Sequence, residues 1–75
     1  MKTQFKFIHM VCWLDQEKDR GWIVLTNKDS PLGTITWYSR WQQHVFDPVV
    51  GTTYSAGCLT DIAAFIVEAN KQVSP

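Results

Sequence analysis

The chain has 75 residues, and its seven basic and seven acidic side chains give a formal net charge of zero. A chain of this length forms one domain, residues 1–75, and buries only about 60–65% of the surface that its unfolded form exposes. The balanced charge excludes the overall basic excess of a typical DNA-binding protein and the acidic excess of a DNA mimic. Ten aromatic side chains are available for a core, an interface or both.

The N-terminal segment does not have the pattern of a signal peptide. Its apolar run is short, His9 interrupts it, and no small-residue cleavage site follows. No stretch reaches the roughly 18 apolar residues that cross a bilayer. The two cysteines, Cys12 and Cys58, allow at most one bridge and do not form a disulfide framework. We therefore expect a cytoplasmic protein with reduced thiols and no membrane contact.

Four segments have the composition of β-strands, because they are rich in β-branched and aromatic residues and are separated by polar turns. The first of them is apolar enough to be a strand buried on both faces, and a short helix is its alternative interpretation. The second alternates, with Trp22 and Val24 on one side and Ile23 and Leu25 on the other. The predicted strands cover residues 5–14, 22–27, 32–38 and 41–47, and residues 52–54 are a candidate for a brief edge strand.

The C-terminal segment has the pattern of an amphipathic helix. Ser55 is a candidate N-cap, because its hydroxyl can accept a hydrogen bond from an amide of the first turn. An apolar stripe begins at Cys58 and includes Leu59, Ile62, Ala63, Phe65, Ile66, Ala69 and Val73. Since such a helix is not stable alone, it must pack on a sheet. The sequence therefore predicts an α+β fold, a small antiparallel β-meander of three to four strands packed against one C-terminal α-helix.

The hairpin of the third and fourth predicted strands decides which aromatic side chains face outward. Ser39 and Arg40 do not suit the positive φ angles of a two-residue turn, so a longer loop with slightly shorter strands is expected. If Tyr38 pairs with Trp41, the hairpin divides into two faces. The drier face, assigned to the helix, carries Ile35, Trp37, His44 and Phe46, and the other carries Thr34, Thr36, Tyr38, Trp41, Gln43 and Val45. The second set has the composition of a binding hot spot. The alternative is that Tyr38 and Trp41 cap a small core, and a register slip of one residue would exchange the faces.

The sequence disfavours metal binding and catalysis. Zinc sites normally contain close pairs of ligands, and the two histidines and two cysteines lack a second such pair. Ser39, His44 and Asp47 are the one local trio suited to nucleophilic catalysis, but strand alternation sends His44 and Asp47 to opposite faces. We therefore expect no metal, no cofactor and no catalytic residues.

Two motifs carry a resemblance to known proteins. Residues 32–48 read Leu-Gly-Thr-Ile-Thr-Trp-Tyr-Ser-Arg-Trp-Gln-Gln-His-Val-Phe-Asp-Pro, and Thr-Tyr-Ser and Cys-Leu-Thr-Asp-Ile-Ala-Ala-Phe-Ile follow at residues 53–55 and 58–66. They are similar to a group of small uncharacterised bacteriophage and prophage proteins with an LGxIxWYxxWRxYxFxP pattern and a CLxDIxxFI helix. Gln42 and His44 depart from the arginine and the aromatic residue of that pattern. The resemblance implies a phage accessory protein in the host cytoplasm and assigns no activity.

The leading hypothesis is a non-catalytic protein that binds and inhibits a host or anti-phage defence protein by occlusion. Its contact candidates are Trp37, Tyr38, Arg40, Trp41 and Gln43. One alternative is a nucleic-acid-binding domain, because aromatic rings beside arginine suit the stacking of single-stranded bases. Another is a homo-oligomer that sequesters a nucleotide signal between tryptophans. The sequence assigns no role to residues 1–21.

Overall fold

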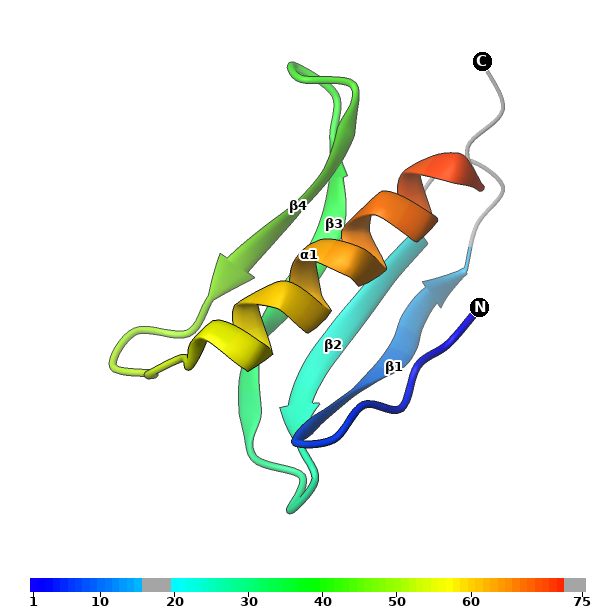
Figure 1. The fold of residues 1–75 in the computed structure, drawn as a ribbon. Helices are drawn as coiled ribbons and strands as arrows, with labels where there is room; N and C mark the ends of the chain where they lie inside the picture. The colour runs from blue at the N-terminus through cyan, green and yellow to red at the C-terminus, as the bar shows by residue number, and fades with distance from the viewer. Residues whose placement is uncertain (16–19, 73–75) are drawn as a thin grey trace.

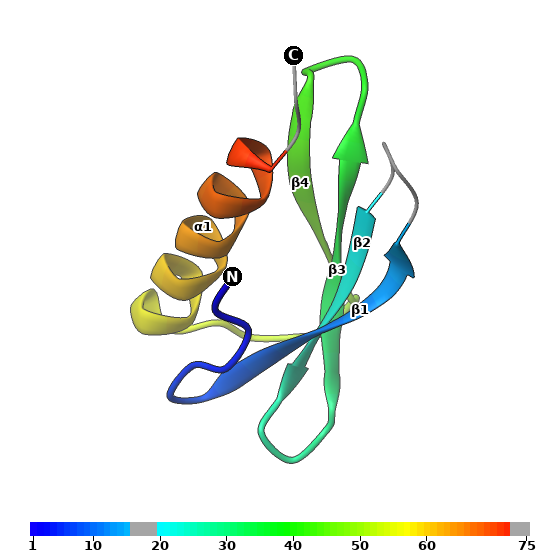
Figure 2. The ribbon, with the colours of Figure 1, turned by 90° about the vertical axis from the view of Figure 1, so that its right-hand side faces the viewer.

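The computed structural model of the chain describes residues 1–15 and 20–72. It contains one antiparallel sheet with the strand order β1-β2-β3-β4 and one C-terminal helix. The elements are β1 (Ile8–Asp15), β2 (Arg20–Thr26), β3 (Pro31–Tyr38), β4 (Gln43–Pro48) and α1 (Ala56–Lys71). The helix lies across one face of the sheet (Figure 1), and the view turned by 90° shows both the helix and the N-terminal segment on that side (Figure 2). The predicted α+β meander with one covering helix is confirmed.

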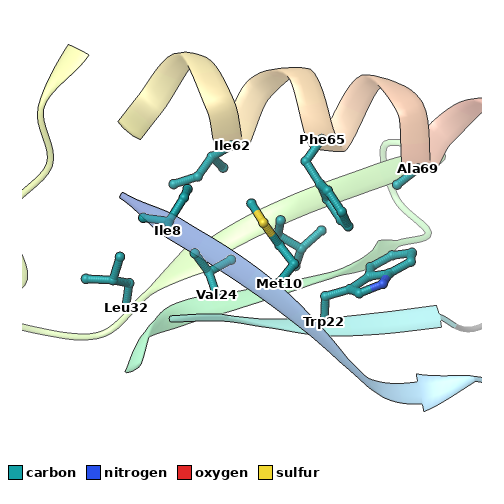
Figure 3. Close-up of a cluster of buried hydrophobic side chains, with 9 residues drawn as sticks. Ile8, Met10, Trp22, Val24, Leu32, Ile62, Phe65 and Ala69 are labelled. Atoms are coloured by element: carbon teal, nitrogen blue, oxygen red, sulfur yellow. The ribbon is translucent and has the colours of Figure 1, made fainter. Parts of the chain in front are cut away.

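The hydrophobic core lies between α1 and the sheet face that it covers (Figure 3). The Trp22 ring meets the Phe65 ring edge to face, with 5.1 Å between the ring centroids. Burial of a side chain of this class stabilises the fold by about 1.5–3 kcal/mol relative to exposure. The buried apolar residues are Ile8, Met10, Trp22, Val24, Leu32, Ile35, Ile62, Phe65 and Ala69.

The helix begins where the sequence predicts, because the Ser55 hydroxyl accepts a hydrogen bond from the amide of Cys58 at 3.2 Å. Its buried stripe is narrower than predicted. Leu59 is 51% exposed and Ala63 is also exposed, so both lie beside the stripe rather than within it. The residues that face the core are Ile62, Phe65 and Ala69, flanked by the partly buried Cys58 and Ile66. Val73 lies outside the described residues.

The first strand is correctly predicted as a strand, but it starts later and is buried on one face only. The side chains of Ile8 and Met10 are buried, whereas Val11 is 45% exposed and Trp13 is 51% exposed. The residues before Ile8 turn back along the strand, and the Met10 amide donates to the Thr3 carbonyl at 2.8 Å. Because the sheet has a helix on one side only, the outward side chains of β1 remain uncovered.

The β3–β4 hairpin differs from the predicted register by two residues. Tyr38 pairs with Gln43 rather than with Trp41, and Ile35 pairs with Phe46. Ser39 and Arg40 do not suit the positive φ angles of a two-residue turn, and the connection is instead a four-residue turn, residues 39–42. The last residue of this turn, Gln42, has a φ of 54°. A shift of two residues leaves every side chain on its original face. The predicted faces are therefore confirmed, although the predicted pairing is wrong.

The segment between β4 and α1 contains no strand, so the edge strand expected at residues 52–54 is wrong. Tyr54 instead turns toward the sheet, where its ring meets Phe46 edge to face with 5.5 Å between centroids. Its hydroxyl donates to the Leu32 carbonyl at 2.6 Å. Gly51 adopts a φ of 86°, a conformation that glycine enters without steric cost. These contacts attach the segment to β3 and β4.

Candidate functional site

The candidate site is the sheet face turned away from α1, which we call the outer face. The strand registers and the alternation of side chains define its members. A sheet face in water normally carries polar side chains, but β1 and β2 present mostly apolar ones here. The outward side chains of the four strands are His9, Val11, Trp13, Ile23, Leu25, Thr34, Thr36, Tyr38, Gln43, Val45 and Asp47.

An aromatic pair stands at one end of the outer face. The rings of Tyr38 and Trp41 meet edge to face, with centroids 5.0 Å apart and planes at 86°. Tyr38 is 36% exposed and Trp41 is 62% exposed. The turn between them is closed by the Trp41 amide, which donates to the Tyr38 carbonyl at 3.2 Å, and by the Gln42 side-chain amide, which donates to the Ser39 carbonyl at 2.6 Å. The two rings are therefore held in place before any partner arrives.

A second indole on the outer face, that of Trp13, was not predicted as a contact residue. Its ring packs against the backbone of Gly21 on the neighbouring strand, because a Cβ at Gly21 would lie 2.9 Å from the Nε1 and Cε2 atoms of Trp13. Half of the indole nevertheless remains exposed. A glycine on β2 opposite a tryptophan on β1 was the available signal, but the interpretation of β1 as buried on both faces concealed it.

The other predicted contact residues divide between the two faces. Arg40 is exposed in the hairpin turn, and Gln43 is exposed on the outer face opposite Tyr38. Trp37 points to the helix side, where it is partly buried and meets the His44 ring with 5.3 Å between centroids. The structure thus brings Tyr38, Arg40, Trp41 and Gln43 to one end of the hairpin, and it separates Trp37 from them.

His44 lies in the interior rather than in a site for proton transfer. Its side chain is 3% exposed and is flanked by Trp22, at 5.6 Å between centroids, and by Trp37. The Oδ1 atom of Asn70 accepts a hydrogen bond from the His44 amide at 2.7 Å and lies 2.9 Å from Nδ1. Because Asn70 Oδ1 is an acceptor only, it accepts from the imidazole in the tautomer that carries its proton on Nδ1. Asp47 faces the opposite side of the sheet, so the trio with Ser39 is not assembled.

Within residues 1–15 and 20–72, no three side chains of His, Cys, Asp or Glu lie close enough together to hold a metal ion. The described helix is too short and too polar to cross a membrane. Cys12 and Cys58 are not joined in a disulfide; Cys12 is exposed and Cys58 is partly buried.

Comparisons with known proteins identify no relative. No protein-family model matches the chain, and no curated protein or solved structure is significantly similar to it.

Proposed function

We propose that the chain is a small phage-encoded binding protein without catalytic activity, which inhibits a host or anti-phage defence protein by covering part of its surface. The outer face is the contact surface in this proposal, with Tyr38 and Trp41 as anchors and Trp13, Arg40 and Gln43 beside them. The single observation that carries it is an uncovered sheet face on which three aromatic side chains are exposed by 36–62%.

The exposed rings are large enough to act as hot spots. A tryptophan presents at most about 250 Å², so the 62% exposed fraction of Trp41 corresponds to about 150 Å². Burial of that area against an apolar partner surface contributes about 4 kcal/mol before the cost of association. The packing of Trp41 on Tyr38 fixes both rings in advance, which lowers the entropy lost on binding.

The charge of the outer face favours a protein partner over a nucleic acid. Among the described strand residues of that face, Asp47 on β4 is the charged side chain, and His9, on the opposite edge strand β1, lies 3.3 Å from the Asp29 carboxylate. Arg40 adds one positive charge at the turn. Nucleic-acid binding depends on several basic groups that neutralise phosphates, whereas the centre of a protein interface is poor in charges and rich in aromatic residues.

The cellular setting in this proposal comes from the sequence resemblance. The proposed setting is the cytoplasm of an infected cell, and its support is the resemblance of the motifs at residues 32–48 and 58–66 to those of small phage and prophage proteins. Occlusion by a chain of this size needs no bound cofactor.

The proposal is tested by affinity capture from host-cell lysate with the wild-type chain and two matched variants. Trp41→Ser removes the most exposed ring of the outer face, and Val67→Ser removes an apolar side chain of similar exposure, 53%, on α1, which covers the opposite face of the sheet. We expect the wild type and V67S to capture one protein in stoichiometric amount, and W41S to lose at least about tenfold in affinity. The purified partner should then lose activity in a titration that ends at a fixed molar ratio.

Two results would contradict the proposal. One is the absence of any captured protein, and the other is capture that W41S and Tyr38→Ser leave unchanged. Binding of oligonucleotides that weakens steeply with salt would instead support the nucleic-acid alternative.

A further inference from the structure

We infer that, in the absence of its partner protein, the outer face is covered by a second copy of this chain. The two sheets lie face to face, related by a twofold axis that makes their strands antiparallel. This inference rests on the proposed function, because it assigns to the same face a self-complex that the partner must displace. Three observations carry it: the composition of the outer face, its area and the placement of its charges.

The composition of β1 and β2 is that of strands covered on both sides. Their outward side chains include Val11, Trp13, Ile23 and Leu25, opposite the buried core residues of the same strands. Strands that are apolar on both faces normally lie between two layers. A second layer over the outer face would account for this composition.

The outer face has the size of a small dimer interface. Four strands at a spacing of about 4.8 Å, each about seven residues long, span roughly 19 by 23 Å. Two copies would therefore bury about 900 Å² of flat area. Trp13 and Trp41 protrude from that plane because about half or more of each side chain is exposed, and they bring the total to roughly the 1,000 Å² of a specific interface.

The charges select one orientation of the two copies. Arg40 lies in the turn before β4, and Asp47 lies near the other end of that strand. Both are exposed, and neither has an ion-pair partner among the described residues. A twofold axis in the plane of the interface and perpendicular to the strands lays β4 over β4 of the second copy in the opposite direction. Each Arg40 then lies near Asp47 of the other copy, and the contact occurs twice.

The alternative axis, parallel to the strands, keeps both turns at the same end of the dimer. It would leave Arg40 of each copy far from Asp47 of the other, so it provides no charge complementarity. In the favoured orientation, the dimer and the partner complex use the same surface and exclude each other. The apparent affinity for the partner should therefore fall as the concentration of the chain rises.

The test measures self-association of the purified chain by sedimentation equilibrium, from low to high micromolar concentration. We expect the wild type to move from 8.6 kDa toward twice that mass. Arg40→Glu and Asp47→Arg should each raise the dissociation constant about tenfold, because each places like charges together at two sites. The double variant R40E/D47R should recover the wild-type value. Lys71→Glu, on an exposed helix position away from the outer face, is the charge-reversal control; it loses the ion pair with Glu68 but should leave the dissociation constant unchanged.

Circular dichroism of each variant establishes that it is folded. A wild-type chain that stays monomeric over the whole concentration range would overturn the dimer. It would not contradict the proposed function, because the capture experiment with W41S tests binding of a partner protein separately. A dimer whose dissociation constant is unchanged by R40E and D47R, or is not restored in the double variant, would overturn the proposed orientation. Dimerisation with reciprocal rescue supports it.

Discussion

The side-chain Oδ1 atom of Asn70, in the last turn of α1, serves two groups of His44 on β4: the backbone amide at 2.7 Å and the Nδ1 atom at 2.9 Å. The two residues are 26 positions apart in the sequence. One amide oxygen therefore attaches the end of the helix to the edge strand and fixes the orientation of a buried imidazole between two indoles.

Replacement of Asn70 by alanine should destabilise the fold strongly. It removes the acceptor of the His44 amide and the polar partner of Nδ1 in a buried position, and each buried group left unsatisfied costs about 1–3 kcal/mol. We expect the free energy of unfolding to fall by about 2–4 kcal/mol in a urea titration. Asn70→Asp keeps an acceptor oxygen and should lose less. Equal losses in the two variants would show that the hydrogen bonds are not the source of the stability.

Gly33 should tolerate no side chain. A Cβ at this position would collide with the Asp47 carbonyl and lie 2.7 Å from the Phe46 ring, and a paired backbone carbonyl cannot move aside. Gly33→Ala should therefore lower the free energy of unfolding by at least about 2 kcal/mol. The control is Gly57→Ala in the first turn of α1, where the nearest atom is 3.8 Å away. That variant should be neutral or more stable by up to about 1 kcal/mol. Thermal unfolding of the pair measures the contrast.

Gly21→Ala should affect binding more than stability. The new Cβ would meet the Trp13 ring at 2.9 Å, but this ring is half exposed and can rotate away from the sheet. We expect a loss of stability of about 1 kcal/mol or less and a displaced indole on the outer face. The affinity for the captured partner should therefore fall although the chain remains folded. Unchanged affinity in G21A would remove Trp13 from the contact surface.

The parts of the fold that follow from neighbouring residues are predictable from the sequence. Ser55 marks the helix start because a cap acts within one turn, and alternation correctly groups Trp22 with Val24 on one side of β2, which the structure shows to be the core side. The expected longer connection after Tyr38 is present, but the assumed pairing was wrong by two residues, because the sequence does not show that the turn ends at Gln42 with a positive φ. The contact between His44 and Asn70 joins distant elements through a single side chain, and no local pattern reports it.

The interpretation of β1 shows a different limit. Its composition correctly indicates strong hydrophobicity on both faces, yet Val11 and Trp13 are exposed. A pattern of residues records that a face is suited to burial, but it does not record whether the covering atoms belong to the same chain. The difference between expected and observed burial on β1 is therefore itself a reason to look for a second molecule on the outer face.

The backbone groups of the edge strands, β1 and β4, determine whether further chains can add to the sheet. On β4 the outward amide of His44 is already bonded to Asn70, and Pro48 has no amide to offer. On β1 the Met10 amide is taken by the Thr3 carbonyl. Lateral addition of strands, the route by which small β-proteins grow into fibrils, is thus hindered at these positions of both edge strands, whereas the face-to-face dimer inferred above would be complete with two chains.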